Sequence, residues 1–297
     1  MCGIVGLMIK KPALRSRLGE LATPMLIGMT ERGPDSAGLA VFTDPVPGEQ
    51  RKYSLYSGVG SADWEGVRAN ASTVSGGATI TVQANHAVLC TGAPVDVVRA
   101  WLKREHPRLH LLSVGKRIDL YKDIGAPAVV AERYDFAHLT GTHVVAHTRM
   151  ATESAVTPAH AHPFTAGEDF CLVHNGSLSN PYQIRRKLEP RGIAFDTDND
   201  TEAATRFLEW RLREGDDLET ALRAGFEELD GFYTFLMGTA DSLALVRDAF
   251  ACKPAIVAET DDYVAVSSEF RSLAALPGVK HAHLFEPKPE ELYVWRA

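Results

Sequence analysis

The strand-like segments of this chain lie toward both ends of the sequence, with a group of helical segments between them. Apolar runs of strand length are expected as strands at 3–9, 37–42, 144–148, 170–174, 232–238, 243–247, 255–258, 263–267 and 291–295. Apolar residues at helical spacing predict helices at 182–188, 202–213 and 217–228, and one around Leu18–Leu26. Strands grouped as hairpins, with helices clustered together, indicate an α+β layered fold rather than alternating βαβ units.

The stretch from 43 to 140 differs from the sequence on either side of it. It opens with the turn cluster Asp44–Gly48, and residues 57–77 are rich in Gly, Ser and Ala without clear periodicity. Strand-like runs return at 79–89 and a helical one at 95–103. We therefore interpret 43–140 as an insertion within one domain that spans 2–297.

Composition narrows the class of protein. The chain has 297 residues, of which 45% are hydrophobic and 23% charged, as in ordinary globular domains and unlike a disordered chain. The net charge of −7 argues against a nucleic-acid-binding surface, and no apolar run approaches the roughly 18 residues of a membrane span. The four cysteines show no paired spacing, which predicts neither disulfides nor a zinc site. We expect a cytoplasmic protein with no nucleic-acid or membrane partner.

Cys2 is the first candidate for chemistry. Removal of the initiator Met would leave a thiol and a free α-amine on the same residue. An α-amine with a pKa of about 7.7–8.0 can accept the thiol proton near neutral pH, and an N-terminal amine is a known activator of a nucleophile. The alternative is that Cys2 simply begins a buried strand, because free Cys is often buried.

Polar clusters at strand ends supply further candidates. Arg149 follows an apolar strand, and its guanidinium has the geometry to hold a carboxylate through two hydrogen bonds. Asn175 and Gly176 also end a strand, where an amide and a backbone N–H are two donors suited to an oxyanion. On their own, these clusters have structural explanations as well: Arg149 can be an Arg that extends toward solvent at a strand end, and Asn175-Gly176 can be an ordinary turn.

The acidic segment 196–202 resembles a calcium loop only superficially. Counting from Asp196, position six is Thr201 instead of Gly and position twelve is Phe207 instead of Glu. A cap for the helix that follows is the better interpretation, with Asp200 also suited to bind an ammonium group.

Five motifs occur in order along the chain. They are Met-Cys-Gly-Ile-Val-Gly at 1–6, Arg-Gly-Pro-Asp-Ser-Ala-Gly at 32–38, His-Thr-Arg-Met-Ala-Thr at 147–152, His-Asn-Gly at 174–176 and Asp-Thr-Glu at 200–202. Together they resemble the glutaminase domain of class II glutamine amidotransferases, which are N-terminal nucleophile hydrolases. The resemblance covers about 1–42 and 141–275, and it implies a four-layer αββα sandwich.

The resemblance also implies roles for individual residues. Cys2 is the expected nucleophile for L-glutamine and its freed amine the base, whereas the Asn175 side chain and the Gly176 N–H form the oxyanion hole. Arg149 is expected to bind the substrate carboxylate and Asp200 its ammonium group. In addition, Arg32 would support the Cys2 terminus, and Thr152 would line the glutamine pocket. The chain departs from the family at Met150, where an aromatic residue is common, and at Glu153, where sugar-aminating members have His.

In this family, hydrolysis of glutamine supplies ammonia to an acceptor molecule, and the same resemblance indicates where the acceptor site lies. After the sandwich and the insertion are counted, no residues remain for an acceptor domain, so the acceptor site is expected on another polypeptide, unless the protein is a free glutaminase. Over its whole length the chain is similar to the stand-alone amidotransferase subunit of glutamate synthase and N-methylglutamate synthase systems. No cofactor is expected in this chain, whereas FMN and an iron–sulfur cluster are expected on the partner synthase subunits.

Two hypotheses that place the protein in another functional class stay open at this point. One is a non-catalytic glutamine-sensing subunit. The other is a metal enzyme that uses the alternating histidines, although solvated or hydrogen-bonded histidines explain these positions more simply, and we expect no metal site. The histidines concerned are His147, His160, His162, His281 and His283.

Overall fold

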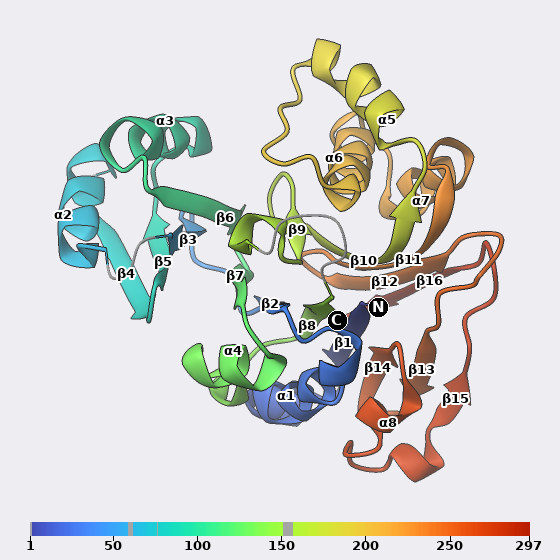
Figure 1. Ribbon diagram of the computed structural model, residues 1–297. Helices are drawn as coiled ribbons and strands as arrows, with labels where there is room; N and C mark the ends of the chain where they lie inside the picture. The colour runs from blue at the N-terminus through green and yellow to red at the C-terminus, as the bar shows by residue number, and fades with distance from the viewer. Residues whose placement is uncertain (1, 59–61, 76, 151–156) are drawn as a thin grey trace.

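A computed structural model describes residues 2–58, 62–75, 77–150 and 157–297. Two antiparallel sheets stack face to face, and helices cover their outer faces (Figure 1). The first sheet, in spatial order, contains β15 (His283–Phe285), β13 (Ile256–Glu259), β14 (Tyr263–Ser267), β1 (Gly3–Ile9), β8 (His143–Arg149), β2 (Ser36–Phe42) and β7 (Ile118–Ile124). The second contains β16 (Leu292–Arg296), β12 (Ser242–Arg247), β11 (Gly231–Gly238), β10 (Cys171–Leu178) and β9 (Phe164–Thr165).

The helices belong to two outer layers. The seven-stranded sheet carries α1 (Leu18–Ile27), α4 (Pro127–Arg133) and the short α8 (Phe270–Leu273). The five-stranded sheet carries α5 (Pro181–Leu188), α6 (Asp200–Arg213) and α7 (Leu218–Glu228). The expected α+β fold, a four-layer αββα sandwich, is confirmed. Every helix in the described ranges is too short or too polar to cross a membrane.

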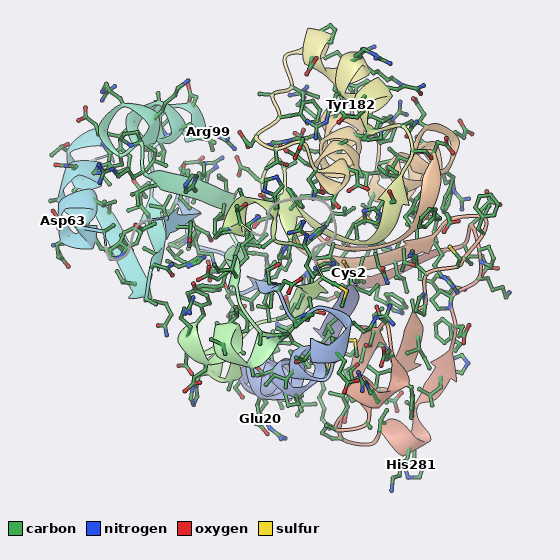
Figure 2. All side chains as sticks on the ribbon, in the orientation of Figure 1. Cys2, Glu20, Asp63, Arg99, Tyr182 and His281 are labelled. Atoms are coloured by element: carbon green, nitrogen blue, oxygen red, sulfur yellow. The ribbon has the colours of Figure 1, made fainter. Side chains whose placement is uncertain are left out.

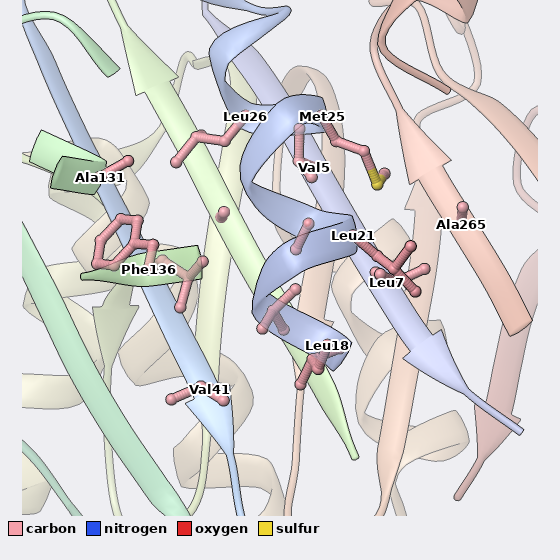
Figure 3. Close-up of a cluster of buried hydrophobic side chains, with 14 of the residues drawn as sticks. Val5, Leu7, Leu18, Leu21, Met25, Leu26, Val41, Ala131, Phe136 and Ala265 are labelled. Carbon is pink, nitrogen blue, oxygen red and sulfur yellow. The ribbon is translucent and has the colours of Figure 1, made fainter. Parts of the chain in front are cut away.

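Strand β1 shows how the sequence builds these layers. All seven of its residues are buried, and side chains alternate between the two faces of a strand. Val5, Leu7 and Ile9 pack against α1 in the outer core, as Figure 3 shows for Val5 and Leu7. Ile4 and Met8 point into the core between the two sheets. A strand buried on both faces is apolar throughout, which explains why 3–9 is a continuous apolar run.

The range predicted as an insertion is divided between two parts of the molecule. A separate four-stranded sheet contains β4 (Ala78–Gln83), β5 (His86–Thr91), β3 (Arg51–Ser57) and β6 (Leu109–Gly115), with α2 (Trp64–Ser75) and α3 (Val95–Glu105) beside it (Figure 1). We call residues 51–115 the lobe. Beyond it, β7 pairs with β2 along its whole length, and α4 and Phe136 pack in the outer core. Of the range predicted as an insertion, residues 118–138 therefore pack with the sandwich, whereas 51–115 form the lobe.

Candidate active site

Cys2 lies directly before β1, near the centre of the molecule (Figure 2). Its neighbour Gly3 pairs with Thr148, so Cys2 lies beside the end of β8, where Arg149 follows Thr148. The side chain of Cys2 is half-buried. Met1 lies outside the described residues.

Arg32 holds the backbone of Cys2. Its Nε donates a hydrogen bond to the Cys2 carbonyl oxygen at 2.9 Å, and its Nη1 donates to Oε1 of Glu269 at 3.1 Å. The Arg32 side chain is buried. Glu269 also forms an ion pair with Arg271, with 2.7 Å between Oε2 of Glu269 and Nε of Arg271. The structure thus brings Arg32 to Cys2, as the sequence predicted. Glu269 was not predicted, because nothing in the sequence connects it with a residue 237 positions away.

The surroundings of the thiol set its protonation. Burial raises the pKa of the Cys2 thiol. A hydrogen bond with the Met150 backbone and the positive charges of Arg149 and Arg32 lower this pKa, but the effect of burial is larger, so the pKa lies above its ordinary value. The thiolate is the nucleophilic form of Cys. A thiol with a raised pKa therefore needs a neighbouring base to become a nucleophile near pH 7.

Arg149 is the last residue of β8 and is buried. Its backbone pairs with Ser36 of β2, and its carbonyl oxygen accepts a hydrogen bond from the Asp35 N–H at 3.1 Å. The Arg-Gly-Pro-Asp motif therefore wraps around the end of β8. This places a buried guanidinium close to the Cys2 thiol, an arrangement suited to a carboxylate ligand.

Asn175 and Gly176 reach the same region from the second sheet. Nε2 of His147, two residues before Arg149, lies 3.0 Å from the carbonyl oxygen of His174, which precedes Asn175. This contact joins β8 to β10 across the two sheets. Nδ2 of Asn175 is buried and has no hydrogen-bond partner among the described residues. Because a buried N–H without an acceptor is unfavourable, this amide is suited to an oxygen ligand.

Gly176 cannot be replaced by a larger residue without moving β11. Its φ of +148° is rare for residues with a side chain. A Cβ at this position would lie 2.0 Å from the carbonyl oxygen of Phe232 on the paired strand. The local backbone therefore requires Gly.

Asp200 begins α6 and connects this helix to β10. Its Oδ2 accepts a hydrogen bond from the backbone N–H of Leu178 at 2.9 Å. A helix cap lies within 196–202, as the sequence predicted, but it is Asn199, whose side chain accepts from the Thr201 N–H at 2.8 Å; Asp200, which was expected to cap, is the first residue of the helix. The Asp200 side chain is one quarter exposed, so its carboxylate is accessible to a cationic ligand.

Thr152, the remaining predicted site residue, lies outside the described residues. The histidines considered as metal ligands do not form one group. The His147 and His162 rings stack at 4.1 Å, whereas Nε2 of His160 lies 3.1 Å from Oδ1 of Asp198. His281 lies far from Cys2 (Figure 2). Within the described ranges, no three His, Cys, Asp or Glu side chains are arranged to hold a metal ion.

Comparisons with known proteins agree with this arrangement. A family profile described as "Glutamine amidotransferase domain" matches residues 147–275. The chain is 45% identical over 296 residues to the "Glutamine amidotransferase-like protein GlxB" of Rhizobium meliloti, an alignment that covers 99% of this chain and 98% of that relative. The chain belongs to the class II glutamine amidotransferases.

Two further similar proteins share only part of their length with this amidotransferase. An amidophosphoribosyltransferase of Methanocaldococcus jannaschii is 30% identical over 167 residues, which are 55% of this chain and 36% of the relative. A solved glutamine phosphoribosylpyrophosphate amidotransferase from B. subtilis has a TM-score of 0.63 at 18% identity and covers 99% of this chain and 47% of its own. This last similarity supports the N-terminal nucleophile hydrolase fold.

Proposed function

We propose that this amidotransferase hydrolyses L-glutamine to glutamate and ammonia through a thioester on Cys2. The observation that carries the proposal is the placement of Cys2, directly before β1, beside the end of β8 that carries Arg149, with Asn175 on the other sheet. The His147–His174 contact joins the two sheets at this place. The thiol attacks the side-chain amide carbon, and its proton passes through the freed α-amine to the departing ammonia. Water then cleaves the thioester and regenerates the thiol.

In this proposal, each polar group of the site contacts a different part of the substrate. Arg149 binds the α-carboxylate, and Asp200 binds the α-ammonium. The Asn175 amide and the Gly176 N–H stabilise the oxyanion of the tetrahedral intermediate. Arg32 holds the Cys2 carbonyl, and Thr152 lines the glutamine pocket. Nδ2 of buried Asn175 has no hydrogen-bond partner in the part of the chain that the structure describes, and this supports its assignment, because an oxyanion supplies the acceptor that the group requires.

We further propose that the ammonia passes to a partner synthase of the glutamate synthase or N-methylglutamate synthase type, which carries FMN and an iron–sulfur cluster. This part of the proposal rests on the resemblance of the sequence, over its whole length, to stand-alone amidotransferase subunits. The four unpaired cysteines support a cytoplasmic location, because thiols persist in reducing compartments.

The test is the release of glutamate from glutamine, measured with and without chains that co-purify from the native cell and with candidate 2-oxo acids. Slow hydrolysis that accelerates with a flavin-containing chain and its acceptor is the expected result. A maximal rate without any partner would indicate a free glutaminase. Tight glutamine binding without hydrolysis would indicate a sensing subunit.

A further inference from the structure

Four buried polar side chains lie directly behind the candidate site. They are His147 on β8, His162 just before β9, His174 on β10 and Thr201 in the first turn of α6, each at most 5% exposed. The hydroxyl of Thr201 lies 2.9 Å from Nε2 of His162 and 3.0 Å from Nδ1 of His174. It also lies 3.4 Å from Oδ1 of Asp200. One hydroxyl with one proton therefore faces two imidazoles and a carboxylate.

Counting protons assigns the direction of each hydrogen bond. Nε2 of His147 must carry a proton, because its partner is the carbonyl oxygen of His174. The other ring nitrogens of the three histidines have no hydrogen-bond partner in the described part of the chain. A buried N–H without an acceptor is rare, and an unpaired ring acceptor is better tolerated. The protons of His162 and His174 are thus assigned to the nitrogens that face Thr201.

This assignment leaves a single place for the Thr201 proton. With both imidazoles donating to its oxygen, the hydroxyl donates to Oδ1 of Asp200. The other oxygen of Asp200 accepts from the Leu178 N–H. Both carboxylate oxygens are then held, one by the backbone of β10 and one by Thr201. The carboxylate is thereby fixed in rotation but keeps lone pairs for another ligand.

Burial keeps the three rings neutral, as the proton count requires. It lowers the pKa of His147 to about 3 and lowers those of His162 and His174 below the usual value. Lys122 is also buried nearby, and its Nζ donates to the carbonyl oxygens of Ala161 and Pro163, which flank His162. Each imidazole therefore has one N–H to donate.

We infer that Thr201 is a positioning residue whose hydroxyl, held by two imidazole N–H groups, orients the Asp200 carboxylate toward the α-ammonium of glutamine. The inference rests on the proposed function, in which Asp200 receives that ammonium. Thr201 itself does not touch the substrate. It acts by joining the start of α6 to His174 of β10 and to His162, which precedes β9.

The first experiment compares Thr201→Val, which keeps the shape and removes the hydroxyl, with Thr201→Ser, which keeps the hydroxyl. Each enzyme is assayed with glutamine and with glutaramate, which lacks only the α-amino group. Since a hydrogen bond to a charged group is involved, we expect Thr201→Val to lower kcat/KM for glutamine about tenfold, mainly through KM. We expect no change for glutaramate, and recovery of the glutamine rate in Thr201→Ser.

Thr205→Val is the matched control. Thr205 is one helical turn further along α6 and is equally buried, and its hydroxyl donates to the Thr201 carbonyl oxygen. Its replacement should leave the preference for glutamine over glutaramate unchanged. Equal losses with both substrates in Thr201→Val would overturn the inference while leaving the glutaminase reaction intact. A wild-type protein that hydrolyses neither substrate would instead overturn the proposed function.

A second measurement is independent of activity and of variants. Long-range ¹H–¹⁵N NMR spectra of the histidine rings distinguish the two neutral forms of each imidazole. We expect the proton of His174 on Nδ1 and the proton of His162 on Nε2. A bare nitrogen facing Thr201 on either ring would take the hydroxyl proton away from Asp200, and the inference would fail.

Discussion

Arg32 donates a hydrogen bond from Nε to the carbonyl oxygen of Cys2 at 2.9 Å, although 30 residues separate the two in the chain. The same guanidinium is anchored by Glu269, which precedes α8. The start of the chain is therefore held by a buried side chain, and the direction in which Cys2 points depends on a contact outside β1.

The first prediction follows from this contact. Arg32→Ala should reduce kcat for glutamine hydrolysis by roughly 10- to 100-fold, because a misplacement of about 1 Å has effects of that size on reacting groups. Steady-state kinetics and circular dichroism measure the effect and confirm folding. Arg17→Ala is the control, since Arg17 is exposed and its guanidinium pairs with Glu20 on the surface. Equal kinetics for the two variants would show that Arg32 does not position Cys2.

The second prediction concerns the start of the mature chain. Active protein should begin at Cys2, because the α-amine can act as a base only after Met1 is removed. Intact mass spectrometry checks this directly. A population that retains Met1 and still hydrolyses glutamine at full rate would contradict the mechanism. Cys2→Ala should abolish both hydrolysis and labelling by a diazoketone analogue of glutamine, whereas Cys252→Ala, at an exposed thiol, should alter neither.

The third prediction separates binding from catalysis. Asn175→Ala removes a donor aimed at the tetrahedral intermediate, and such losses typically lower kcat by ~10²–10³. Arg149→Ala removes a contact to an unreacting end of the substrate, so a raised KM should form a large part of its effect. Asn70→Ala, on the exposed face of α2 in the lobe, is the control. An unchanged kcat in Asn175→Ala would remove Asn175 from the oxyanion hole.

The fourth prediction concerns stability at Gly176. Gly176→Ala should lower the free energy of unfolding by more than about 2 kcal/mol, since a strained backbone conformation alone costs about 1–3 kcal/mol and the new Cβ would also clash with Phe232. Gly92→Ala is the control, because a Cβ at that position meets nothing within 4 Å. Urea denaturation of the two variants gives the comparison. Similar midpoints would show that β10 relaxes without cost.

The fifth prediction is a pH dependence that arises away from the site. Burial lowers the pKa of His143 to about 3 in the folded state, whereas the ordinary value is 6.5. Between these values the unfolded chain binds a proton that the folded chain excludes, so stability falls as pH decreases below 6.5. One such group contributes a slope of up to about 1.4 kcal/mol per pH unit.

His143→Gln should therefore flatten the decrease in unfolding free energy between pH 6 and pH 5, measured by urea denaturation. His281→Gln, at an exposed position, should leave the slope unchanged. Identical slopes for the wild type and His143→Gln would show that His143 gains no proton on unfolding in this range.

The strands of the sandwich were predictable because their cause is local. A strand buried on both faces, such as β1, is apolar at every position. The same reasoning missed β7, whose sequence Ile-Asp-Leu-Tyr-Lys-Asp-Ile places charges inside a buried strand. Lys52 of β3 pairs with Asp119 at 2.7 Å, and Lys122 donates to the carbonyl oxygens of Ala161 and Pro163. The partners of Asp119 and Lys122 are distant in sequence, so nothing near β7 reveals that these two charges are satisfied.

The lobe was missed in part for a related reason. Among residues 64–73 of α2, whose side chains the structure describes, Trp64, Val67 and Ala71 belong to the lobe core, and the Gly, Ser and Ala content of the helix resembles a loop. Burial of so few side chains becomes favourable only when the four-stranded sheet is already beside them. The position of α2 is therefore a property of the assembled lobe.

The same distinction between local and long-range causes applies to the candidate site. From the five motifs alone, Cys2, Arg32, Arg149, Asn175 and Asp200 could be predicted as site residues, because a motif names residue types without reference to a fold. How these residues are held could not be predicted: Glu269 anchors Arg32, and Thr201, with His162 and His174, faces Asp200. Such contacts join residues that lie far apart in the sequence, and their geometry exists only after the strands and helices that carry them have packed.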